Sequence, residues 1–155
     1  MRIVDLARIV CVVCTGIYAG VILGDRLGAS FARPALSDSD FVLFQQIQHV
    51  HFKPLLLPMT VCAVLGGLIW VYSLRSRWKE PPFWLAAAGC AAMIAAVALT
   101  RAVNFPINDA LMTWRAAAPP SDARALWASW EHAHSVRAVL SLGAFVLQVF
   151  ALNCK

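Results

Sequence analysis

The chain has 155 residues, 61% of them hydrophobic and 14% charged, and it carries a formal net charge of +5. A soluble domain of this length needs more polar surface than that to cover its core, so the surplus apolar surface must contact the lipid bilayer. The basic residues are scattered between apolar runs, which argues against a nucleic-acid-binding surface, and residues 1–155 are expected to form a single membrane domain.

Four stretches without a charged residue predict an all-α membrane protein built as a bundle of four transmembrane helices. A helix needs about 20 apolar residues to cross the ~30 Å hydrocarbon core of a bilayer, and each stretch reaches or approaches that length. The chain is therefore expected to be an integral membrane protein. The four stretches cover residues 9–24, 54–74, 81–100 and 138–154.

The first stretch contains three glycines at intervals of four residues, Gly16, Gly20 and Gly24. Small residues at this spacing share one helix face and let another helix approach closely. We expect this face to pack inside the bundle, and a homo-oligomer formed through it stays open as the alternative. Cys11 and Cys14 have redox-type spacing, but inside an apolar run we interpret them as packing residues.

The link between the second and third stretches indicates how the bundle is oriented. Residues 75–80 hold three basic side chains, Arg75, Arg77 and Lys79. Basic residues accumulate in cytoplasmic loops, so we predict that this link lies in the cytoplasm. With four spans, both termini are then cytoplasmic as well.

The second and fourth helices are predicted to be longer than a bilayer requires. Residues 37–40 offer a cluster of good helix N-caps, and no helix breaker follows until Pro54. Residues 119–122 similarly open a segment that has no glycine until Gly143. Both helices should exceed thirty residues and extend on the non-cytoplasmic side.

Polar residues from three predicted helices converge at that end of the bundle. A rise of 1.5 Å per residue puts His49, Asn104, Asn108 and His134 roughly 29 to 39 Å above the cytoplasmic end. Spacings of three and four residues put Gln45 on the face of His49, and Trp130 and Arg137 on the face of His134. Ionisable groups at membrane depth are costly unless they face the bundle interior, so we predict one polar pocket there. A histidine or tryptophan taken singly is more typical of an interfacial anchor.

The motif Asn104-Phe-Pro-Ile-Asn108, followed by Trp130, His134 and Arg137, resembles the anthrone oxygenase-like family. The resemblance spans roughly residues 9–153, and its specific part covers residues 104–137. It implies a small four-helix membrane protein, and characterised members convert polyketide anthrones to anthraquinones. It carries an expected functional role onto these five matching residues, whereas the match around His49 and His51 is looser.

The first hypothesis is an oxygenase acting on a lipophilic, phenolic, anthrone-like substrate. His49 or His134 would remove an acidic C–H proton, because the histidine pKa ordinarily lies near working pH. Arg137, with Asn104 or Asn108, would stabilise the resulting oxyanion. Such a route requires no organic cofactor, and no nucleotide-binding glycine motif is present. The substrate would be held by Gln45, Asn104, Asn108 and Trp130.

Two alternatives stay open. Copper or iron could be bound by histidine nitrogens, or haem by two facing histidines, the four candidates being His49, His51, His132 and His134. Residues two apart on a helix point to nearly opposite sides, so one histidine per helix is the more natural arrangement. The other alternative is not an enzyme at all but a lipid or quinone binder, or an assembly partner of a larger complex.

Overall fold

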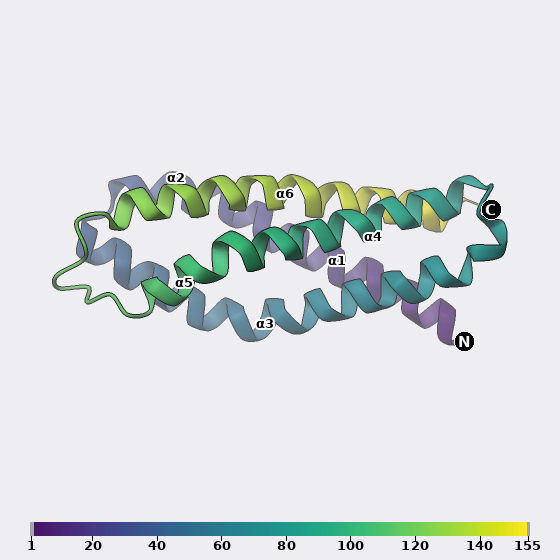
Figure 1. Ribbon diagram of the computed structural model, residues 1–155, viewed down its shortest axis with the longest axis horizontal. Helices are drawn as coiled ribbons and strands as arrows, with labels where there is room; N and C mark the ends of the chain where they lie inside the picture. Colours follow the sequence, from purple (N-terminus) through teal and green to yellow (C-terminus); the bar gives the residue numbers. More distant parts are fainter. Residues whose placement is uncertain (1, 155) are drawn as a thin grey trace.

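The computed structural model describes residues 2–154, which form one elongated bundle of long helices lying side by side (Figure 1). Four segments are long and apolar enough to cross a membrane, which confirms the predicted four-helix membrane fold. The residues described contain no β-strand. The helices are α1 (Ile3–Leu27), α2 (Ala29–Ala32), α3 (Asp38–Ser73), α4 (Pro81–Leu99), α5 (Phe105–Leu111) and α6 (Ala123–Asn153).

The predicted lengths of the second and fourth transmembrane helices are confirmed. Helix α3 has 36 residues and α6 has 31, which correspond to about 54 and 46 Å at 1.5 Å per residue. Ser37 caps α3 as expected, because its side chain accepts a hydrogen bond from the Asp40 amide at 3.1 Å. Both helices are therefore much longer than the ~30 Å that hydrocarbon demands.

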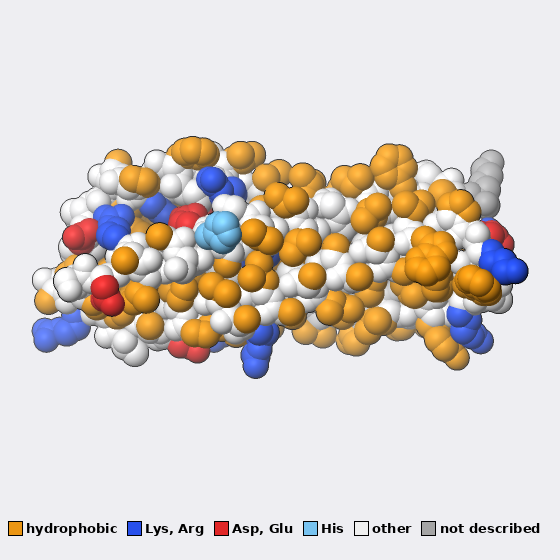
Figure 2. All heavy atoms as spheres, turned by 45° about the horizontal axis from the view of Figure 1, so that its top comes forward, with side chains coloured by type: hydrophobic (Ala, Val, Ile, Leu, Met, Phe, Trp, Pro, Cys, Tyr) orange, Lys and Arg blue, Asp and Glu red, His pale blue; other side chains and the backbone are white. Residues whose placement is uncertain are grey.

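Both chain ends lie at one end of the bundle, together with the basic link between α3 and α4 (Figure 1). The opposite end, called here the polar end, carries α2, α5 and the N-terminal parts of α3 and α6. On the face in Figure 2, charged side chains gather towards the two ends, and hydrophobic side chains cover most of the middle. That the polar end faces away from the cytoplasm stays a prediction.

The glycine face of α1 is divided between two environments. A Cβ added at Gly16 would lie 2.7 Å from the Phe145 ring of α6, so this glycine allows close helix packing. Gly20 and Gly24 meet nothing within 4 Å. The expectation that all three glycines pack inside the bundle is therefore wrong for these two, because the neighbouring helices do not cover their side of α1.

Prolines leave two helices irregular near the polar end. Pro54 and Pro58 lie inside α3, where a proline cannot donate the helical hydrogen bond, and α3 is visibly curved (Figure 1). Pro106 lies in the first turn of α5, and the chain reaches it from α4 through a π-helical turn, Thr100–Asn104, without a break. The wider turn accommodates the missing amide without ending the helix.

Candidate functional site

A cavity of about 530 Å³ opens at the polar end of the bundle, lined by α1, α3, the end of α4, the π-helical turn, α5 and α6. Its size is in the range of pockets that hold small organic ligands. The cavity brings together six of the seven residues predicted to be catalytic or substrate-binding, namely Gln45, His49, Asn108, Trp130, His134 and Arg137. The seventh, Asn104, is buried behind this lining and donates through Nδ2 to the Trp130 carbonyl at 3.2 Å.

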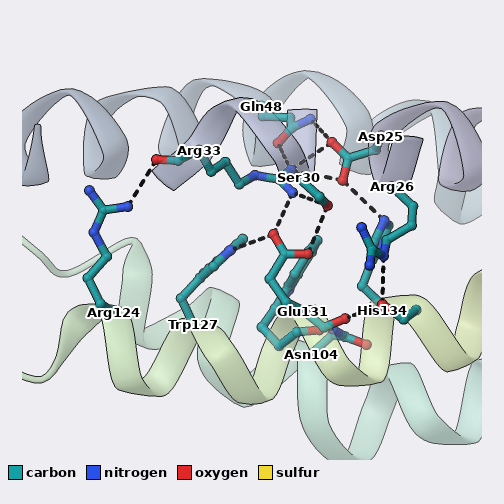
Figure 3. Close-up of polar contacts among 12 residues, drawn as sticks. Asp25, Arg26, Ser30, Arg33, Gln48, Asn104, Arg124, Trp127, Glu131 and His134 are labelled. Atoms are coloured by element: carbon teal, nitrogen blue, oxygen red, sulfur yellow. Dashed lines mark hydrogen bonds and ion pairs between the residues drawn. The ribbon is translucent and has the colours of Figure 1, made fainter. Parts of the chain in front are cut away.

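The centre of the polar end is a buried arginine, Arg33, which is only 2% exposed. Its Nη2 donates to both oxygens of Asp25 at 2.7 and 2.8 Å, and its Nη1 donates to Glu131 at 2.6 Å. The same guanidinium also reaches Ser30 and Gln48 at 2.8 and 2.9 Å. Figure 3 shows α6 and the end of α1 joined through this group. A buried charge is tolerable only when it is paired in this way.

Asp25 connects this ion cluster to the cavity and was missed by sequence reasoning. Its carboxylate accepts from Arg33 and from Gln48, and its Oδ2 lies 3.1 Å from His134 Nε2. One signal was available, because an acid that ends an apolar run at membrane depth needs a buried partner. Nothing in the local sequence identified Arg33 as that partner.

His134 and Arg137 form the next link along α6. Arg137 Nη2 donates to His134 Nδ1 at 2.7 Å, and Nη1 donates to Thr100 Oγ1 at 3.3 Å. Within residues 2–154 no carboxylate forms an ion pair with Arg137, and its buried Nε has no hydrogen-bond partner. The cavity therefore contains a cation, 7% exposed, without a directly paired anion.

An aromatic stack forms one wall of the cavity. The Trp127 and Trp130 rings are stacked with centroids 4.3 Å apart, and Trp130 is stacked on the His134 ring at 4.7 Å. Trp130 Nε1 donates to Asn108 Oδ1 at 2.8 Å, which ties α6 to α5. The three- and four-residue spacing read from the sequence thus produces a column of three stacked rings beside Arg137.

The remaining predicted residues lie in different surroundings. Gln45 is buried, and with its amide oxygen turned towards Arg33 Nε it accepts at 2.7 Å. His49 is half-buried in the cavity lining. His51 and His132 are exposed and do not line the cavity. Among residues 2–154, no three His, Cys, Asp or Glu side chains are arranged to hold a metal ion.

The mouth of the cavity lies between α3 and the third transmembrane segment. The exposed lining residues come from these two segments alone, Lys53 and Leu57 from α3, Arg101 from the π-helical turn and Asp109 from α5. Both segments are among the four that are long and apolar enough to cross a membrane.

One protein family matches the part of the chain that contains most of the cavity lining. The family model described as anthrone oxygenase matches residues 44–147, which include α3 from the cavity onward, α4, α5 and most of α6. No curated protein and no solved structure matches the chain.

Proposed function

Because the chain belongs to the anthrone oxygenase family, we propose that it is a membrane oxygenase acting on a lipophilic phenolic aromatic in this cavity. The observation that carries the proposal is Arg137, a buried cation in the cavity lining that forms no ion pair with a carboxylate within residues 2–154. Such a cation is well suited to an anion that forms there during a reaction.

The shape of the cavity supports a planar aromatic substrate. One wall is the stack of Trp127, Trp130 and His134, and further apolar lining comes from Phe52 and Phe105. The edges of stacked rings favour edge-to-face contact with another aromatic ring. A mouth between two membrane-spanning segments would give a water-insoluble substrate a route from the bilayer, and we propose that it faces the outer leaflet.

The reaction we propose converts a CH₂ group beside an aromatic carbonyl system into a second carbonyl. A base in the cavity removes one C–H proton, and the resulting carbanion is delocalised onto the existing carbonyl oxygen. Molecular oxygen bonds to the carbon, and the O–O bond then breaks as the second hydrogen leaves. The carbon keeps one oxygen atom as C=O, and the other departs in water, so one O₂ oxidises one CH₂ group.

Arg137 would stabilise the developing oxyanion, and Asn108 would orient the substrate. Arg137 supplies a fixed positive charge in surroundings of low dielectric constant, where its interaction with an anion is strong. The Asn108 amide nitrogen makes no hydrogen bond within residues 2–154, because Trp130 uses only the Asn108 oxygen. Asn108 can therefore donate to the substrate. Asn104, already bonded to the Trp130 carbonyl, would support the aromatic wall.

The proposal is tested by measuring oxygen uptake and quinone absorbance with protein reconstituted in phosphatidylcholine vesicles and supplied with a hydroxylated anthrone. The expected result is one O₂ consumed per quinone formed, well above the rate in vesicles without protein. Elemental analysis and visible spectroscopy of the same sample would reveal a metal- or haem-dependent reaction instead. Tight binding of the anthrone without oxygen uptake would overturn the oxygenase and favour a carrier.

A further inference from the structure

The hydrogen bond between Arg137 and His134 determines which nitrogen of the histidine carries its proton. A guanidinium group has five N–H donors and no acceptor, so the atom it contacts must offer a lone pair. Arg137 Nη2 lies 2.7 Å from His134 Nδ1. Nδ1 must therefore be unprotonated, and the proton of the neutral ring lies on Nε2, which faces Asp25 Oδ2 at 3.1 Å.

This arrangement leaves His134 no capacity to accept a proton from a substrate. Its one free lone pair is taken by Arg137, its N–H faces Asp25, and one face of its ring is covered by Trp130. The residue is only 1% exposed. Protonating Nδ1 would break the bond to Arg137 and put a second cation against the guanidinium, away from water.

His49 differs in each of these respects. It lines the same cavity and is half-buried, and no group within residues 2–154 forms a hydrogen bond with its ring. A neutral imidazole always has one nitrogen with a free lone pair. His49 can therefore turn that lone pair towards a bound molecule.

We propose that His134 is a positioning residue, with its Nε2 3.1 Å from Asp25 and its Nδ1 aiming the Arg137 guanidinium into the cavity, and that His49 is the catalytic base. This contact is the shorter of the two hydrogen bonds that join Arg137 to His134 and Thr100, and within residues 2–154 the Arg137 Nε has no hydrogen-bond partner. The assignment of His49 rests on the proposed oxygenase function, whereas the His134 tautomer does not.

The tautomer is tested without any substrate, by NMR of the full chain labelled with ¹⁵N at histidine in detergent at pH 7. The four histidine signals are assigned by their loss in single His→Asn variants. We expect His134 to be neutral with its hydrogen on Nε2 and its Nδ1 hydrogen-bonded, and the Nδ1 signal to shift in Arg137→Gln. A hydrogen on Nδ1, or a doubly protonated ring, would overturn the positioning role.

The division of roles is tested by turnover of the reconstituted protein with the hydroxylated anthrone. In His134→Asn the amide oxygen occupies nearly the place of Nδ1 and can accept from Arg137, so activity should stay within about tenfold of the original. His134→Leu offers no acceptor and should lose much more. His49→Asn should lose about 10²- to 10⁴-fold, the usual contribution of a general base.

The matched controls are His51→Asn and His132→Asn, which change exposed histidines outside the cavity and should keep full activity. Loss of activity in His134→Asn as complete as in His49→Asn, with both proteins folded, would contradict the proposal. Full activity of His49→Asn would do the same. Absence of turnover in the original protein, with the His134 tautomer as expected, would refute the oxygenase function and leave the Asp25–His134–Arg137 arrangement standing.

Discussion

Near the chain ends the helices approach one another through glycines, whereas at the polar end they are joined by charged side chains. A Cβ at Gly66 would lie 2.8 Å from the Ala7 carbonyl of α1, and one at Gly89 would lie 2.9 Å from Gln148 of α6. At the polar end, Arg33 joins α1 to α6 through Asp25 and Glu131.

The chain-end half of the bundle serves mainly to stabilise the fold, whereas the polar end contains the cavity. Backbones in close contact leave no room for a ligand, and at the chain-end half the core consists of residues such as Cys11, Trp70 and Ala86. At the polar end the curved α3 and the π-helical turn accompany the cavity, and the ion cluster of Arg33, Asp25 and Glu131 joins the helices around it. We therefore expect substitutions in the chain-end half to change stability, and substitutions in the cavity to change turnover.

The largest expected difference is in accessibility, because the two ends of the bundle are predicted to face opposite sides of the membrane. Single cysteines placed at Ser39 and Ser76, in a chain whose native cysteines are replaced by alanine, should react with an impermeant thiol reagent from opposite sides of intact cells. Only the Ser39 position should be labelled from outside. Labelling of both from the same side would overturn the predicted topology.

Arg33→Leu should cause the greatest loss of stability. It leaves Asp25 and Glu131 without their shared cation, and breaking a buried ion pair costs about 3–5 kcal/mol. Thermal unfolding in detergent should show a strongly lowered Tm. Arg115→Leu is the matched control, since Arg115 is exposed and forms no ion pair within residues 2–154. Equal Tm values for the two variants would mean that the cluster does not hold the polar end together.

Arg137→Gln should affect turnover more than stability, because Arg137 has no carboxylate partner to leave unpaired. Removing one donor to a reaction oxyanion typically lowers kcat by about 10² to 10³. Steady-state turnover and the Tm of the same sample would be measured beside Arg115→Gln. A variant that unfolds while Arg115→Gln does not would make Arg137 a structural cation.

Gly66→Ala should destabilise the chain-end half by about 1–3 kcal/mol, the usual cost of overpacking, because the added methyl group meets the backbone of α1. Gly20→Ala makes the same chemical change in open space and should leave the Tm unchanged or slightly raised. Catalytic properties of any folded Gly66→Ala protein should be retained. A fall in Tm for Gly20→Ala as large as for Gly66→Ala would indicate that the exposed face of α1 is covered by another chain.

Asn108→Ala should have the mildest effect. A neutral hydrogen bond is worth about 1 kcal/mol, which corresponds to about a fivefold increase in KM for the anthrone. Asn153→Ala at the chain-end half is the control and should not alter KM. A loss of turnover as large as that of Arg137→Gln would place Asn108 in the reaction itself rather than in substrate orientation.

Much of this architecture was predictable because it depends on local patterns. Apolar length determines which segments can span a membrane, and the Ser37 cap and the lack of breakers before Pro54 predicted the extension of α3. Helix periodicity placed Trp130, His134 and Arg137 on one face, and the motif from Asn104 onward identified the family, which the match over residues 44–147 confirms.

Only the tertiary structure decided how these residues are partnered. Arg33 and Glu131 are 98 positions apart in the chain, and neither periodicity nor composition indicates which distant charge a buried side chain will meet. The same holds for Asp25, which was overlooked, and for Gly20 and Gly24, whose face of α1 no neighbouring helix covers. The tautomer of His134 follows from its contact with Arg137 along α6 and its proximity to Asp25 of α1. Backbone preference is local, so sequence patterns predict helices well, whereas the pairing of side chains depends on the packing of the whole bundle.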